Sequence, residues 1–155
     1  MSAKNKIDEL NLELPPAPKP GGVYQPVLVL GNLAYVSGHG PVLNDETMIT
    51  GRVGDTMDTA EAKRAARQTG LAILASLRAR LGSLDRVKRL VKSFGMVNAT
   101  PDFAEHPKVI NGYSELMAEV FGPENGVGSR SAVGMGSLPG NIAVEIEAVF
   151  EITEE

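Results

Sequence analysis

Strand-like segments at both ends of this chain, with two helix-like segments between them, predict an α+β fold: a mixed β-sheet with two helices packed on one face. The chain has 155 residues, of which 43% are hydrophobic, enough to bury one core but too few for two ordinary domains. Its first 22 residues are polar and then rich in proline and glycine, a composition typical of an extended arm. We therefore expect an N-terminal arm over residues 1–22 and a single folded domain over residues 23–155.

The first element of the folded domain should be a β-hairpin. Two apolar runs, Val27–Leu30 and Leu33–Ser37, flank Gly31-Asn32, and this pair can supply the positive φ angles of a tight turn. The glycine-rich segment 38–57 that follows is expected to be a loop, with one short strand around Met48–Gly51.

Helical spacing follows this loop. Asp58 can cap a helix, apolar or small residues recur every three or four positions, and Gly82 can end it, which predicts a helix over residues 59–81. A second helix is predicted over Phe103–Phe121. Pro107 lies in its first turns, where a missing backbone donor costs little.

Three further strands are predicted over residues 87–97, 130–135 and 143–152. In the last strand, strict alternation places the apolar residues on one face and Glu145 and Glu147 on the other. The two helices should cover the apolar face. In the strand over 130–135, Val133 and Met135 should join the core, and the same alternation then sends Arg130 to the helix-free face. We therefore expect Arg130 and Glu145 to lie on the same side of the sheet.

The first hairpin is apolar on both of its faces, a pattern of strands that are covered on both sides. Two helices can cover only one side of the sheet. Burial of the other side therefore predicts a homo-oligomer, with Arg130 and Glu145 in or beside the interface.

Composition excludes several classes of function. The chain has no cysteine, which rules out disulfides, thiolate nucleophiles and cysteine-based metal sites. Its net charge of −4 and its 5% aromatic content argue against nucleic acid as a partner, although nine of the fifteen basic residues fall between Lys63 and Lys92. No segment approaches the roughly 20 apolar residues of a membrane span, and the polar start is unlike a signal peptide, so we expect a cytoplasmic protein.

Five short motifs, in order, resemble those of the RidA/YjgF family, over roughly residues 22–152. They are Gly31-Asn32-Leu33-Ala34-Tyr35-Val36-Ser37-Gly38, Asn111-Gly112-Tyr113 ahead of Val120-Phe121-Gly122, Ser129-Arg130-Ser131, Leu138-Pro139, and Val144-Glu145-Ile146-Glu147-Ala148. The resemblance implies a chorismate-mutase-like fold and a homotrimer with clefts between subunits. It also implies 2-iminobutanoate/2-iminopropanoate deaminase activity without a metal or organic cofactor, although some members carry the label endoribonuclease L-PSP.

The resemblance also assigns roles to residues. Arg130 would hold the carboxylate of an imino or keto acid, and Glu145 would position the water that attacks the C=N bond. Guanidinium suits bidentate binding of a carboxylate, and a carboxylate base contributes roughly 10²–10⁴-fold to a rate. Further residues at cleft positions, taken as candidates for substrate binding, are Tyr24, Ser37, Gly38, His39, Asn111 and Ala132.

Two of these candidates depart from the family, which often has Gln where this chain has His39 and Cys where it has Ala132. The arm and the loop at 39–57 also look longer than in compact members, as in a divergent subfamily. Substrate preference therefore stays open.

Structural roles compete with the functional ones: an interface ion pair for Arg130, a polar loop position for His39, and caps or turns for Ser37 and Asn111. Tyr24 is explained equally well as a partly buried residue of the arm. A noncatalytic binder of small carboxylates is the alternative function, and RNA cleavage a less favoured one.

Overall fold

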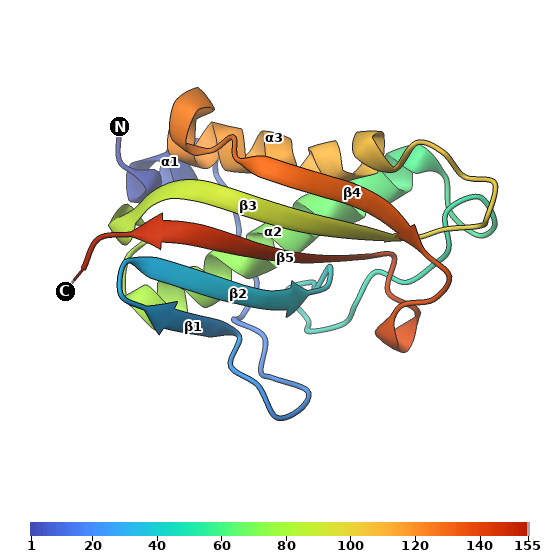
Figure 1. Cartoon of the computed structure of the whole chain (residues 1–155), viewed down its shortest axis with the longest axis horizontal. Coiled ribbons are helices and arrows are strands. Elements are labelled where there is room, and N and C mark those ends of the chain that lie inside the picture. The colour runs from blue at the N-terminus through green and yellow to red at the C-terminus, as the bar shows by residue number, and fades with distance from the viewer. Residues whose placement is uncertain (155) are drawn as a thin grey trace.

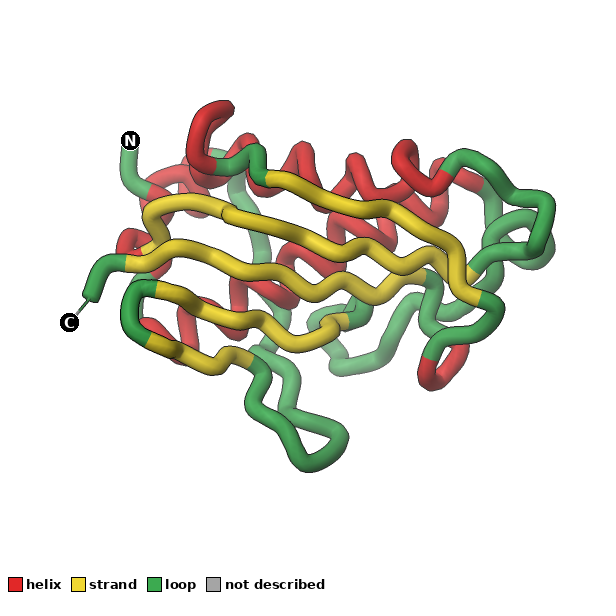
Figure 2. The backbone as a smooth tube through the Cα atoms, in the orientation of Figure 1, coloured by secondary structure: helices red, strands yellow, loops and turns green. Residues whose placement is uncertain are grey.

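The computed structural model describes residues 1–154 and shows a five-stranded sheet in the order β1-β2-β5-β3-β4, with two long helices packed on one face (Figure 1; Figure 2). This is the predicted α+β architecture. The elements are α1 (Ala3–Glu9), β1 (Val27–Leu30), β2 (Leu33–His39), α2 (Thr59–Leu81), β3 (Val87–Asn98), α3 (His106–Asn125), β4 (Ser129–Met135) and β5 (Val144–Ile152), with single 3₁₀ turns at Leu84–Arg86 and Pro139–Asn141.

The predicted hairpin and first helix are confirmed. β1 and β2 pair antiparallel around a turn in which Gly31 has a φ of +60°. The Asp58 carboxylate accepts a hydrogen bond from the Glu61 backbone N–H at 2.8 Å, which begins α2. Gly82 ends α2 with a φ of +83°, a conformation that costs glycine little because it lacks a Cβ.

The second long helix begins later and ends later than the sequence indicates. α3 starts at His106, three residues after the predicted start, with Pro107 in its first turn as expected. It runs to Asn125 but is interrupted at Gly122, whose φ of +89° is not helical. The apolar spacing stops at this break, which is why the sequence predicts an end at Phe121.

Two expectations for the irregular segments are wrong. The segment around Met48–Gly51 is not a strand, because Met48 and Thr50 form only isolated bridges, to Val42 and Ile142. The N-terminal arm is not extended throughout: residues 3–9 form α1, capped by the Ser2 hydroxyl.

The arm is attached to the body by burial as well as by hydrogen bonding. Ala3 and Ile7, one turn apart on α1, are both buried, and so is Pro15 further along the arm. The Lys4 backbone N–H donates to the Asp85 carboxylate at 3.0 Å. An apolar pair spaced i, i+4 can dock even a short helix, and the pattern is too brief to predict one.

β4 lies parallel to β3, and β3 separates it from β5. The connection through Leu138 and Pro139 is therefore a crossover from the outer strand to the centre of the sheet, not a hairpin. As a result β4 is an edge strand, paired on one side only (Figure 1).

The faces of β5 are as predicted. Val144, Ile146, Ala148, Phe150 and Ile152 are buried beneath the helices, and the intervening residues lie on the helix-free side, called here the open face. The open face is apolar in large part. Leu28 and Tyr35 remain 48% and 41% exposed there, so this face is not covered within one chain.

The prediction for β4 is wrong. Arg130 is paired in register with Ser93, whose buried hydroxyl bonds to Tyr113 of α3 at 2.9 Å, so Arg130 lies on the helix side of the sheet. Val133 and Met135, taken as core residues, lie on the opposite side and are only partly buried. An edge strand is covered incompletely on both faces, so apolar side chains do not show which face is inward.

None of the helices within residues 1–154 combines the length and apolar character needed to cross a membrane.

Candidate functional site

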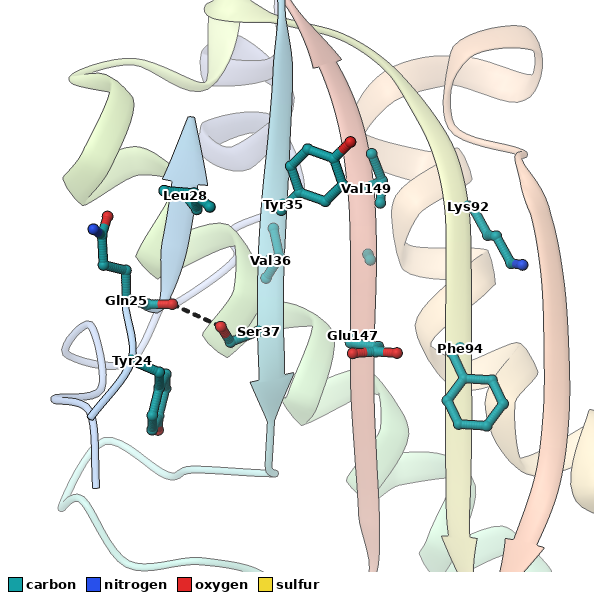
Figure 3. A pocket seen from close by; sticks show the side chains of 11 residues that line it. Tyr24, Gln25, Leu28, Tyr35, Val36, Ser37, Lys92, Phe94, Glu147 and Val149 are labelled. Atoms are coloured by element: carbon teal, nitrogen blue, oxygen red, sulfur yellow. Dashed lines mark hydrogen bonds between the residues drawn. The ribbon is translucent and has the colours of Figure 1, made fainter. Parts of the chain in front are cut away.

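The open face is hollowed between the hairpin and the centre of the sheet, forming a depression of about 640 Å³ (Figure 3). Apolar and aromatic side chains make up most of its lining, and Lys92 and Glu147 supply its charges. The lining residues are Tyr24, Gln25, Leu28, Tyr35, Val36, Ser37, Lys92, Phe94, Glu147, Ala148 and Val149. Such a surface, apolar with a few charged groups, is typical of a binding site or an interface.

Two of the predicted site residues, Tyr24 and Ser37, line this depression. Gly38 and Glu145 lie beside it on β2 and β5, and together the four are called here the open-face group. The Ser37 hydroxyl donates to the Gln25 carbonyl at 2.6 Å and so joins β2 to the segment just before β1 (Figure 3). The hydroxyl of Tyr24 accepts from the Gly21 backbone N–H at 3.2 Å. Both residues thus have structural roles while still facing the depression.

Gly38 and Glu145 are in direct contact across the neighbouring strands β2 and β5. A Cβ at position 38 would collide with the carboxylate of Glu145, so the glycine allows this side chain to lie flat over β2. Partial burial of the carboxyl group, and secondly the negative charge of Glu147, raise the pKa of Glu145. A carboxylate with a raised pKa is suited to accept a proton near neutral pH.

Three further residues with assigned roles, Asn111, Arg130 and Ala132, lie at the other side of the molecule, between β4 and α3. Arg130 donates from Nη1 to the Ser114 hydroxyl at 3.0 Å and from Nη2 to the Pro107 carbonyl at 3.4 Å. Asn111 is on the same stripe of α3, four residues after Pro107 and three before Ser114, and all three are spaced to face β4. Ala132 follows Arg130 on the same face of β4. Asn111, Ser114, Arg130 and Ala132 are called here the edge group.

Arg130 keeps its positive charge uncompensated. No carboxylate among residues 1–154 lies within ion-pair distance of its guanidinium, and both acceptors that hold it are neutral. The guanidinium has five N–H donors, so these two bonds leave enough for a bidentate contact with a carboxylate.

The open-face group and the edge group cannot meet within one chain. Arg130 and Glu145 lie on opposite faces of the sheet and two strands apart, and their register partners on β3, Ser93 and Met96, are three residues apart. Strand spacing and rise place them about 10 Å apart in each direction within the sheet. The expectation that they share one face is therefore wrong.

His39 belongs to neither group, contrary to the expectation that it contacts the ligand. It is buried against α2, where Nε2 lies 2.8 Å from the Ser76 hydroxyl and Nδ1 lies 2.6 Å from the Ser37 carbonyl. Because a carbonyl only accepts, Nδ1 carries the proton and Nε2 accepts from Ser76. Burial lowers the pKa of His39 and keeps the ring neutral. A register shift in β2 after Val36 turns this side chain inward, which the sequence pattern does not reveal.

Ser114 is a site residue that the sequence reasoning missed. Its only signal is its position three residues after Asn111, on the same helical stripe. No other feature of the sequence distinguishes a functional serine within a predicted helix from a structural one.

The basic cluster between Lys63 and Lys92 is not a continuous cationic surface. Lys63 and Arg67 of α2 pair with Glu115 and Glu119 of α3 at 3.2 and 3.1 Å, and Lys88 pairs with Glu151 at 3.3 Å.

Residues 1–154 hold no cluster of three His, Asp or Glu side chains placed to bind a metal ion.

Comparison with known proteins agrees with the fold and the motifs. The family described as "YjgF/chorismate mutase-like, putative endoribonuclease" matches residues 5–150. Protein TCP17 of Trypanosoma cruzi is 38% identical over 146 residues, which cover 94% of this chain and 91% of that protein. A 2-iminobutanoate/2-iminopropanoate deaminase of Dermatophagoides farinae is 30% identical over 142 residues, covering 91% and 94%.

Solved structures show the same architecture. Atu1372 of Agrobacterium tumefaciens, described as of unknown function, is 41% identical with a TM-score of 0.86, covering 97% of this chain and 91% of that one. A structure from Shewanella oneidensis, described as a putative endoribonuclease, is 28% identical with a TM-score of 0.92, covering 98% and 100%. Because the family matches nearly the whole length of this chain, the chain belongs to the YjgF/RidA family, and one of its relatives is a named imine deaminase.

Proposed function

We propose that this protein hydrolyses small 2-imino acids to 2-keto acids and ammonia, at sites formed between two copies of the chain. The observation that carries the proposal is the half-buried guanidinium of Arg130, which is held by neutral acceptors and has no carboxylate partner within residues 1–154. A small carboxylate would complete its coordination. The named activity of the Dermatophagoides farinae relative has a substrate of this class.

The chemistry requires little beyond binding and a base. The edge group would hold the substrate carboxylate at Arg130, and the open-face group of a neighbouring copy would bring Glu145 to the imine carbon. Glu145 takes a proton from the water as its oxygen adds to that carbon, and passes this proton to the nitrogen, which becomes an amine. The new hydroxyl group then gives up its proton to the amine nitrogen by way of Glu145, the C–N bond breaks, and ammonia leaves as the C=O bond of the keto acid forms. Fixing the substrate beside its base supplies much of the entropic part of catalysis.

Two copies are needed because the open-face group and the edge group lie on different surfaces of one chain. A contact between unlike surfaces is head-to-tail, and a head-to-tail assembly that closes on itself is a ring. The apolar open face, with Leu28 and Tyr35 exposed, supplies the area that such a contact would bury. A homotrimer, the assembly expected from the family resemblance, is the smallest ring of this kind.

The direct test uses 2-iminobutanoate generated in situ, with ketoacid release followed against a buffer control. We expect the wild type to accelerate release, and Arg130→Ala and Glu145→Gln to lose most of the acceleration. Arg64→Ala and Glu124→Gln, at exposed positions on α2 and α3, are the matched controls and should act as the wild type does. If wild-type release equals the buffer rate, hydrolysis is excluded. Thermal stabilisation by 2-ketobutanoate that Arg130→Ala removes would then indicate a noncatalytic binder.

Mixing the two inactive variants tests whether the site is shared. If Arg130 and Glu145 of one site come from different copies, random 1:1 mixed assemblies contain about one quarter of sites with both residues intact. We expect co-refolded Arg130→Ala and Glu145→Gln chains to regain about that fraction of wild-type activity. A mixture as inactive as its components would show that one chain supplies both residues.

A further inference from the structure

Arg130 is fixed by contacts that do not neutralise it. An arginine side chain has many rotamers, and a free surface arginine would lose this freedom on binding a ligand. In Arg130 part of this conformational freedom is already lost before a ligand binds, because Ser114 Oγ accepts from Nη1 at 3.0 Å and the Pro107 carbonyl accepts from Nη2 at 3.4 Å. The guanidinium is therefore oriented before any ligand arrives.

The charges of α3 are arranged so that Arg130 stays available. Glu115 and Glu119 follow Ser114 on α3, but their carboxylates pair with Lys63 and Arg67 on the side of α3 that faces α2. The stripe that faces β4 carries neutral groups at Pro107, Asn111 and Ser114. A carboxylate at position 114 would pair with Arg130 and compete with an acidic ligand, and an alanine would leave Nη1 without its acceptor.

We infer that Ser114 is a positioning residue, which orients the Arg130 guanidinium for a substrate carboxylate while leaving its charge uncompensated. This inference rests on the proposed function and adds to it a determinant of carboxylate affinity. Ser114 Oγ accepts the hydrogen bond from Arg130 through one of its own lone pairs, so the hydroxyl hydrogen of Ser114 stays available to donate. The hydroxyl thus serves as a neutral support beside the cation.

Two substitutions at position 114 separate this role from a structural one. Ser114→Ala removes the acceptor and should raise KM for 2-iminobutanoate about fivefold, the equivalent of one ordinary hydrogen bond, with a smaller change in kcat. Ser114→Asp supplies a stronger acceptor for Arg130 but cancels its charge, and should raise KM and weaken 2-ketobutanoate binding by more than tenfold. A purely structural role predicts the reverse order, because aspartate would hold the guanidinium better than alanine does.

Ser114→Thr, which keeps the hydroxyl, should restore KM to within about twofold of the wild type. Ser137→Ala, at an exposed serine in the link between β4 and β5, is the control and should change neither KM nor binding. Thermal melting of each variant, and 2-ketobutanoate binding by calorimetry, check folding and affinity independently of turnover. Wild-type activity with unchanged KM in Ser114→Ala and Ser114→Asp would overturn the role of Ser114 alone. A wild type that neither turns over the imine nor binds the keto acid would overturn the proposed function, and this role with it.

Discussion

Arg130 and Glu145 differ in what surrounds their charges. Arg130 lies against neutral acceptors of α3, whereas Glu145 lies on the open face with the second carboxylate, Glu147, two residues further along the strand. The first arrangement keeps a cation ready for an anion. The second disfavours the ionised form of Glu145 and moves its pKa upward.

The influence of Glu147 on Glu145 leads to a pH-dependent prediction. Glu147→Gln removes a negative charge, so the pKa of Glu145 should fall and the base should stay ionised to lower pH. We expect the acid limb of the pH profile of kcat/KM to move to lower pH, with the plateau retained. The profile of Glu124→Gln serves as control. An acid limb that stays in place, or moves upward, would contradict the assignment of Glu145 as the base.

At the scale of elements, the contact between α2 and α3 depends on a glycine. A Cβ at Gly112 would collide with the backbone carbonyl of Lys63 on α2, which cannot move aside as a side chain can. Close approach of the two helices lets Lys63 and Arg67 reach their partners on α3.

Gly112→Ala should therefore destabilise the protein although alanine favours a helix. The propensity gain is about 1 kcal/mol, and overpacking costs about 3 kcal/mol here, the upper end of its usual range, because the contact is with backbone that cannot move aside. We expect the free energy of unfolding, measured by urea denaturation, to fall by about 2 kcal/mol. Gly136→Ala, where a Cβ would meet nothing within 4 Å, should change it by less than about 0.5 kcal/mol. Equal stabilities of the two variants would show that the helices can separate without cost.

The bounds of an element could be predicted closely where the sequence itself contains the residues that begin and end it. The Asp58 cap and the Gly82 stop give the observed bounds of α2, and Gly31 gives the hairpin. α1 was missed because its pattern spans only seven residues. The burial of His39 was missed because it follows from a register shift, which depends on how β2 pairs with β5.

At the scale of the whole molecule, the open face should be the contact surface between copies. Leu28 and Tyr35 are the exposed apolar residues over which a neighbour would pack, and a charge there would be buried without a partner. We expect light scattering to give the mass of three chains for the wild type and a lower mass for Leu28→Asp combined with Tyr35→Asp.

This variant should also lose imine hydrolysis, although Arg130 and Glu145 are intact, because each site needs a neighbouring copy. Leu10→Asp, at an exposed position beyond α1, is the control and should keep both mass and activity. A monomeric wild type that still hydrolyses the imine would contradict the shared site.

The amino-acid sequence by itself determined the α+β class, the bounds of the first long helix, the alternation of β5 and the motifs of the family, because each depends on residues close together in the chain. Only the tertiary structure decided where Arg130 points and that its group is separated from Glu145. The physical reason is that β4 inserts at the edge, parallel to β3, and the facing of an edge strand is set by its partner and by α3 rather than by its own apolar pattern.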